Sequence, residues 1–269
     1  MKFSFMTFSC PELAWDDVLA VARRFGYDGV EPRAQANHAH GVETTASADE
    51  RALIRRKADH AGIDISCLAT SCRYTLADPA ELAQMMDDSR ALIALARDIG
   101  APCLRVFGGG IPEGMSRDDA VAQVADCLAA LAPAAQAADV VLCVETHDSW
   151  CDARELARVI SRVGHPHVQV NWDIMHPVRA GMSMDEAYEA IGAFARHCHF
   201  HDGRQLDKGL ELCPVGEGVV DHRRAVEILT RAGFEGHMSG EWINWEPWET
   251  HLPREIAAMR ALVAEVAEG

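Results

Sequence analysis

The chain has 269 residues, with 25 Lys and Arg against 41 Asp and Glu, and therefore a formal net charge of −16. A hydrophobic share of 49% and a charged share of 25% are typical of a globular protein with a buried core, and exclude a disordered or fibrous chain. The acidic balance argues against a general affinity for nucleic acid, because such binding depends on a surplus of Lys and Arg. We therefore expect no nucleic-acid partner.

The N-terminal segment and the cysteines favour a cytoplasmic protein. Ser4, Thr7 and Ser9 interrupt the first apolar residues, which argues against a secretory signal. No uncharged apolar run reaches the roughly 18 residues that a membrane span requires, so no membrane association is expected. The nine cysteines include no C-x-x-C pair, and several lie in apolar runs. This pattern predicts buried, reduced thiols rather than a disulfide framework.

Short apolar runs alternate with longer helical stretches along the whole chain. The runs have the length of strands, and the apolar residues between them recur at spacings of three and four, which is typical of helices. We expect strands at 2–7, 29–31, 63–70, 103–107, 140–145, 168–173, 198–202 and 238–243. Helices are expected at 15–25, 47–61, 81–99, 117–138, 153–163, 184–195, 222–232 and 251–267.

Helix start and end signals lie at the boundaries of these predicted helices. Ser47 and Glu50 have the spacing of a capping box at the start of the second helix. Most predicted helices end at a glycine that precedes the next strand, as glycine readily takes the left-handed conformation that ends a helix. These glycines are Gly26, Gly62, Gly100, Gly164 and Gly233.

Eight strand-and-helix units of about 34 residues (269/8) predict a (β/α)8 TIM barrel with a parallel sheet. The alternative is a doubly wound open sheet, which has fewer strands and, when it binds a dinucleotide, a G-x-G-x-x-G turn after the first strand. The residues after the first strand here are Phe-Ser-Cys-Pro-Glu, without any glycine. No linker or low-complexity segment divides the chain, so we expect a single domain over residues 1–269.

Four apolar runs in the second half of the chain end in polar residues. They lead into Glu145, into Asp173 with His176 after it, into His199 and His201, and into Glu241. The carboxyl ends of barrel strands form the active site of a TIM barrel, so these positions predict a functional site. Three carboxylates and one imidazole suit one divalent metal ion, Mn²⁺, Mg²⁺, Co²⁺ or Zn²⁺. The alternative is that each residue is a separate helix cap or ion-pair partner.

The same segments resemble the xylose isomerase-like TIM barrel superfamily, which includes the sugar phosphate isomerase and epimerase family. The resemblance extends over the chain and rests on EPR at 31–33, ETHD at 145–148, NWDIMH at 171–176, HFHD at 199–202, GEG at 216–218 and GEW at 240–242. Members of this superfamily include ketose 3-epimerases, hydroxypyruvate isomerase, inosose dehydratase and isomerase, 3-dehydroshikimate dehydratase and endonuclease IV.

The resemblance implies a role for each matching residue. Glu145, Asp173, His199 and Glu241 match the metal ligands, and the two glutamates match the acid/base pair of the ketose epimerases. His176 matches a histidine that contacts substrate. His201 lies where relatives place a residue facing the substrate, and His147 is similar to a position in the 3-dehydroshikimate dehydratases.

Two departures from the superfamily patterns narrow the choice of relatives. Cys151 stands where the ketose 3-epimerases have a substrate-binding Glu, which weakens that particular match. The additional metal ligands of endonuclease IV are missing, because Cys72-Arg73, 105–107 and 218–221 occupy the corresponding segments. With the acidic charge, this makes a role in DNA repair improbable.

The chemistry of the predicted site is consistent with these implications. Removal of a proton next to a carbonyl produces an enediolate, and a divalent ion stabilises its charge while two carboxylates transfer the proton. We therefore expect a divalent-metal-dependent isomerase or epimerase acting on a keto-sugar, an inosose or a small hydroxy-ketone. A metal-dependent dehydratase acting on a similar substrate is the alternative, and a sugar-binding barrel without turnover is a third possibility.

Further candidates for substrate contact allow two interpretations each. Arg105 and Arg33 could bind a carboxylate or phosphate, or pair with an internal acid, since a buried Arg needs an anionic partner. Trp242 could pack on the apolar face of a sugar, or contribute with Trp245 and Trp248 to the barrel top or to a contact within a homo-oligomer. Gly108, Gly109 and Gly110 could bind a phosphate, or form a flexible loop.

Overall fold

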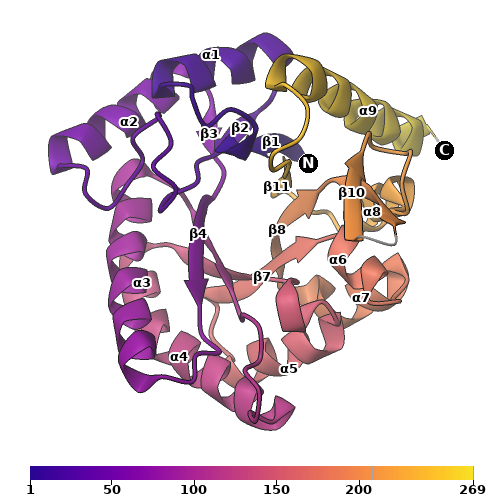
Figure 1. The fold of residues 1–269 in the computed structure, drawn as a ribbon. Coiled ribbons are helices and arrows are strands. Elements are labelled where there is room, and N and C mark those ends of the chain that lie inside the picture. The colour runs from indigo at the N-terminus through magenta and orange to yellow at the C-terminus, as the bar shows by residue number, and fades with distance from the viewer. Residues whose placement is uncertain (207–208, 269) are drawn as a thin grey trace.

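The strands form a parallel barrel that is surrounded by helices (Figure 1). The computed structural model describes residues 1–206 and 209–268. The sheet order is β3-β2-β1-β11-β8-β7-β6-β5-β4, and each neighbouring pair in it is parallel. The predicted TIM barrel is therefore confirmed. The barrel strands are β1 (Lys2–Met6), β2 (Gly29–Glu31), β3 (Asp64–Ile65), β4 (Leu68–Arg73), β5 (Cys103–Phe107), β6 (Val141–Glu145), β7 (Val168–Asp173), β8 (Ala195–Phe200) and β11 (His237–Gly240).

The third predicted strand, at 63–70, is divided in two. Its first part, β3, pairs with β2, and its second part, β4, pairs with β5. The barrel is closed beyond β2, where Arg33 forms a parallel bridge with Ala69 and the backbone N–H of Ala69 donates to Pro32 O over 3.0 Å. The third predicted strand is thus observed as two short strands that follow each other along the chain. Counted as one position, they leave the predicted eight strand positions around the barrel unchanged.

The helices cover the outside of the barrel, and most begin and end close to the predicted residues. Ser47 and Glu50 form the predicted capping box. The third predicted helix starts two residues earlier, because Asp78 caps it and Pro79 is its first residue. The sixth predicted helix, at 184–195, ends earlier, because strand β8 has begun by Ala195. The helices are α1 (Trp15–Phe25), α2 (Ala48–Ala61), α3 (Pro79–Ile99), α4 (Arg117–Ala138), α5 (Ala153–Val163), α6 (Met175–Arg179), α7 (Met184–Ile191), α8 (His222–Arg231) and α9 (Trp248–Glu268).

Helix α4 is long and apolar enough to cross a membrane, judged by length and composition only. In this structure it packs between α3 and α5, and one face of it is buried, including Val121, Val124 and Leu128. Its place in the ring of helices explains its apolar composition. The nine cysteines are free thiols, and all except Cys151 are buried, as the sequence predicts.

A two-stranded antiparallel hairpin, which the sequence pattern did not predict, follows β8. It consists of β9 (Asp202–Leu206) and β10 (Gly209–Cys213). In Figure 1 this hairpin lies beside α8 at the edge of the barrel. The hairpin strands are short, and β9 begins two residues after the buried strand β8 ends. The sequence pattern of β9 therefore cannot be distinguished from a continuation of β8.

Asp202 holds the segment after the hairpin in place. Its buried carboxylate accepts backbone N–H groups of Gly203 (2.9 Å), Gly216 (3.0 Å), Gly218 (2.9 Å) and Val220 (3.2 Å). A methyl group at Gly218 would overlap this carboxylate. The GEG motif therefore has a structural explanation, since only glycine permits the close approach at 218.

We expect Asp202→Ala to lower the free energy of unfolding by about 3 kcal/mol, because it leaves buried backbone N–H groups without an acceptor. Urea denaturation followed by circular dichroism measures this difference. Glu211→Ala is the control, as Glu211 is exposed on β10. Equal stability of the two variants would contradict this role of Asp202.

Candidate active site

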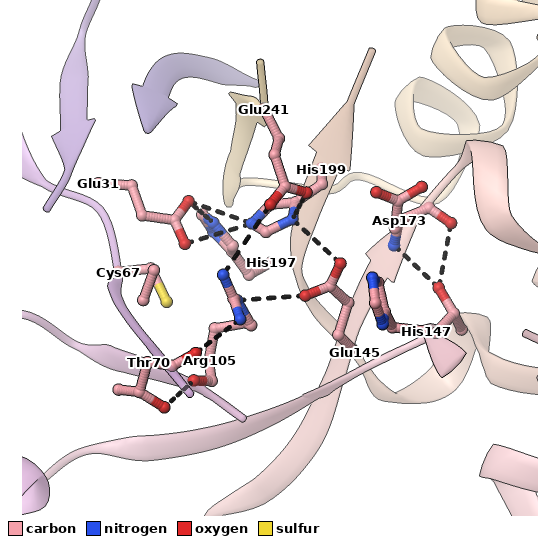
Figure 2. A network of polar contacts seen from close by, with 12 residues as sticks. Glu31, Cys67, Thr70, Arg105, Glu145, His147, Asp173, His197, His199 and Glu241 are labelled. Atoms are coloured by element: carbon pink, nitrogen blue, oxygen red, sulfur yellow. Dashed lines mark hydrogen bonds and ion pairs between the residues drawn. The ribbon is translucent and has the colours of Figure 1, made fainter. Parts of the chain in front are cut away.

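The ends of four barrel strands bring Glu145, Asp173, His199 and Glu241 together (Figure 2). Glu145 and Asp173 are the last residues of β6 and β7, His199 lies near the end of β8, and Glu241 follows β11. One potential ligand atom of each lies within 4.8 Å of those of the others. All four residues are buried. These are the four residues that the sequence predicts as metal ligands.

His199 is surrounded by carboxylates. Its Nδ1 lies 3.1 Å from Glu241 Oε2 and 3.5 Å from Glu145 Oε1, while its Nε2 lies 3.2 Å from both oxygens of Glu31. Burial acts to lower the pKa of His199, but the carboxylates of Glu31, Glu145 and Glu241 raise it well above its usual value. A group of buried carboxylates therefore creates a strong preference for positive charge at this place.

Several carboxylate oxygens of the site accept no well-aligned hydrogen bond. Both oxygens of Glu145 and Oδ2 of Asp173 are buried in this way, although Arg105 Nε lies 3.1 Å from Glu145 Oε2 and His201 Nε2 lies 2.8 Å from Asp173 Oδ2. The other oxygen of Asp173 accepts the backbone N–H groups of Met175 (2.8 Å) and His176 (3.1 Å), at the start of α6. Buried polar atoms are rarely left without partners, so these oxygens are suited to a cation. Three carboxylates and one imidazole fit a divalent ion that prefers oxygen ligands.

Arg105 lies beside the carboxylates, on β5. Its guanidinium is fully buried, with Nε 3.1 Å from Glu145 Oε2 and Nη2 3.9 Å from Glu241 Oε1. Nη1 donates to the carbonyl of Thr70 over 2.7 Å. Of the two interpretations left open by the sequence, the structure thus favours pairing with internal acids over direct contact with substrate.

Glu31 and His197 also belong to this network, although neither was predicted as a site residue. His197 Nε2 lies 2.8 Å from Glu31 Oε2, so Glu31 connects His197 with His199. Burial raises the pKa of Glu31, but the two imidazoles lower it well below its usual value. His197 and His199 alternate on β8, which places both side chains on one face of the strand, and this spacing was the available signal. The proximity of Glu31 to these histidines could be recognised only from the closed sheet, because Glu31 lies on β2, on the other side of β1 and β11 from β8.

Three further histidines lie in a row next to Asp173. The ring centres of His147 and His176 are 4.6 Å apart, and those of His176 and His201 are 5.8 Å apart. His201 Nε2 lies 2.8 Å from Asp173 Oδ2, whereas the backbone N–H groups at the start of α6 donate to Oδ1. The structure thus brings the three histidines predicted to contact substrate to the edge of the four-residue cluster.

His147 is the most accessible of these histidines. Its side chain is 34% exposed, and Nδ1 lies 3.0 Å from Asp148 Oδ1. Although burial acts in the opposite direction, the hydrogen bond to Asp148 raises the pKa of His147 to about 9. The imidazole is therefore positively charged at neutral pH.

Trp242 and the glycine segment, two other candidates from the sequence, are packed against neighbouring side chains. Trp242 is 1% exposed and packs against Phe200 and His251, with ring centres 5.4 and 5.1 Å away. This burial favours closure of the barrel top over contact with a sugar.

Trp150 Nε1 donates to Gly109 O over 2.8 Å, and a methyl group at Gly108 would overlap the indole. Trp150 thus packs against Gly108 and Gly109, which argues against the flexible loop, one of the two interpretations of this segment.

A family model described as "Xylose isomerase-like TIM barrel" matches residues 19–262. The chain belongs to this family. The resemblance noted in the sequence is thereby confirmed.

The chain is similar to L-ribulose-5-phosphate 3-epimerase UlaE of Salmonella paratyphi A, with 25% identity over 255 residues, which cover 91% of this chain and 87% of UlaE. Its fold is similar to the structure of L-ribulose 3-epimerase, with a TM-score of 0.82, 18% identity and coverage of 99% and 96% of the two chains. It is also similar to the probable 3-DHS dehydratase AsbF from Bacillus anthracis, with a TM-score of 0.81, 16% identity and coverage of 97% and 99%. The family and the epimerase relative confirm the prediction of an enzyme.

We expect Glu31→Gln to lower the free energy of unfolding by about 3 kcal/mol in EDTA, because two buried imidazoles lose their charged partner. Denaturation in urea measures the change. Glu217→Gln is the matched control, since Glu217 pairs with Arg204 at 2.9 Å on the surface. That exposed pair should contribute no more than about 0.5 kcal/mol. Similar losses in both variants would contradict a special role for the Glu31 network.

Proposed function

We propose that this chain is a divalent-metal-dependent isomerase or epimerase that acts on a keto-sugar, an inosose or a small hydroxy-ketone. The observation that carries the proposal is the convergence of Glu145, Asp173, His199 and Glu241, whose buried carboxylates include oxygens that accept no well-aligned hydrogen bond. The relative UlaE, named as an L-ribulose-5-phosphate 3-epimerase, supports the same class of reaction.

In this proposal the four residues hold one Mn²⁺, Mg²⁺, Co²⁺ or Zn²⁺ ion. When bound, the ion supplies Lewis-acid stabilisation of the negative charge that develops on the substrate oxygens as a proton leaves the neighbouring carbon. The donor set supports this assignment because it is rich in oxygen and contains a single nitrogen, with no thiolate.

Glu145 and Glu241 are the proposed pair that removes and returns the proton. They come from β6 and β11, which are separated in the sheet by β7 and β8, so they approach the site from different directions. Arg105 lies within ion-pair distance of both carboxylates, so its positive charge compensates theirs. Return of the proton to the same carbon from the opposite side gives epimerisation, and return to the neighbouring carbon gives isomerisation.

His176 and His201 are proposed to orient the substrate hydroxyl groups. His201 lies against Asp173 at 2.8 Å, and His176 lies 3.8 Å from the same oxygen, so both rings border the proposed ion. Holding the substrate in one orientation accounts for a large part of the acceleration in such reactions.

A dehydratase is the second candidate, and His147 favours it. Asp148 fixes Nδ1 of His147, and the ring lies at the exposed edge of the cluster, beside His176. A histidine held in this way can supply a proton to a departing hydroxyl group. Such a step would follow the same removal of a proton next to a carbonyl.

We expect Asp173→Asn and His199→Ala each to abolish tight binding of one divalent ion, because each removes a ligand. The measurement is the metal content of purified protein by mass spectrometry, after loading with Mn²⁺ and removal of free ions. His60→Ala is the control, as His60 is an exposed residue of α2. Retention of one ion per chain by both site variants would refute the ligand assignment.

We expect the metal-loaded protein to exchange the proton next to the carbonyl of a suitable substrate with D₂O. NMR and mass spectrometry of recovered L-ribulose 5-phosphate, D-psicose and an inosose would detect deuterium and any product. Glu145→Gln and Glu241→Gln should each lower the exchange rate at least about 100-fold. Loss of water from the substrate would identify the dehydratase, and lack of exchange with every substrate would favour a barrel that only binds sugar.

A further inference from the structure

Arg33 is a buried cation near the active site that the proposed mechanism does not use. The residue is 7% exposed. Its guanidinium donates to the backbone carbonyls of Ala34 and Ala69 and to Ser71 Oγ. Among residues 1–206 and 209–268, no carboxylate lies within ion-pair distance of it. Arg105, by comparison, contacts two carboxylates.

A buried arginine without an acid is an expensive arrangement, because neutral partners do not compensate its charge. Burial and the nearby charge of Arg105 lower the pKa of Arg33 to about 10, although the carboxylates of Glu43 and Glu241, which lie beyond ion-pair distance, act in the opposite direction. The planar guanidinium has donor groups that match two oxygens of a carboxylate or phosphate. An anionic ligand would therefore complete the surroundings of Arg33.

Arg33 follows β2 and lies at the same end of the barrel as the candidate metal ligands. Arg33 lies two residues after Glu31, so the two side chains share a face of the chain. The distance along the strand is about 7 Å, towards the carboxyl end where TIM-barrel active sites lie. Glu31 already contacts His199 from this face. The ring of Phe8, 5.6 Å away, borders the guanidinium on another side.

We propose that Arg33, with Ser71, binds a carboxylate or phosphate group of the substrate. The substrate is then an anionic hydroxy-ketone or sugar, with its carbonyl at the cluster of Glu145, Asp173, His199 and Glu241 and its charged end near β2 and β4. This inference rests on the proposed function, because it names the class of substrate for the same site.

A purely structural role for Arg33 makes a different prediction. The residue lies where β2 and β4 close the barrel, and its hydrogen bonds to Ala69 and Ser71 connect the two segments. If closure were its whole role, substitution would lower stability, but the protein would bind charged and neutral ligands equally well.

Three probes with one carbon framework test the proposal. Isothermal titration calorimetry with Mn²⁺-loaded protein compares glycerol 3-phosphate, glycerate and glycerol. We expect one of the two anions to bind at least tenfold more tightly than glycerol, and the preferred anion identifies phosphate or carboxylate as the group recognised. Equal binding of all three probes, or no measurable binding of either anion, would overturn the proposal.

Variants then assign the preference to this residue. Arg33→Gln should remove it, Arg33→Lys should retain part of it, and Arg24→Gln, at an exposed position of α1, should leave it unchanged. Metal content and thermal unfolding are measured for each, and if Arg33→Gln does not fold, Ser71→Ala replaces it and should weaken binding of the preferred anion. Unchanged preference in the folded variant would overturn the role of Arg33. A wild-type protein that binds metal without preferring an anion contradicts this inference alone, whereas failure to bind metal contradicts the proposed function.

Discussion

The structure depends on negative charge that is concentrated around one buried imidazole. Glu31, Glu145 and Glu241 lie within 3.5 Å of His199 nitrogens, in the buried interior of the barrel. Such a group of carboxylates is stable only with positive charge among them. The guanidinium of Arg105 and the proposed metal ion satisfy this requirement. The need for compensation explains why so many charged side chains occupy the interior of the barrel.

The need to compensate buried charge also distinguishes the roles of the two buried arginines, Arg105 and Arg33. Arg105 lies among acids, whereas Arg33 contacts only neutral acceptors among the described residues. A buried charge whose partners all come from the protein needs no ligand, whereas a buried charge without an oppositely charged partner marks a candidate ligand-binding position. Asp202 belongs to the first kind, because four backbone N–H groups donate to its carboxylate.

Much of the site could be predicted because it lies at strand ends. Asp173 and Glu145 each close an apolar run, and the carboxyl ends of parallel strands meet at one end of a barrel. Their proximity followed from the fold class, without any knowledge of distances. Trp242 shows the limit of this reasoning, because its position after a strand is compatible with contact to a ligand or with burial. Only its packing against Phe200 and His251 favours one of them.

The sequence by itself determined the alternation of strands and helices, the number of units and the acids that close the strands. These features are local, since hydrophobic periodicity and helix caps depend on residues a few positions apart. The tertiary structure decided which side chains meet inside the barrel: Glu31 with His199, Arg105 with Glu145, and Arg33 with Ser71. It also decided that the third strand divides at Ser66 and Cys67. The physical reason is that partners across the barrel are chosen by strand order, register and closure, which link residues far apart in the chain.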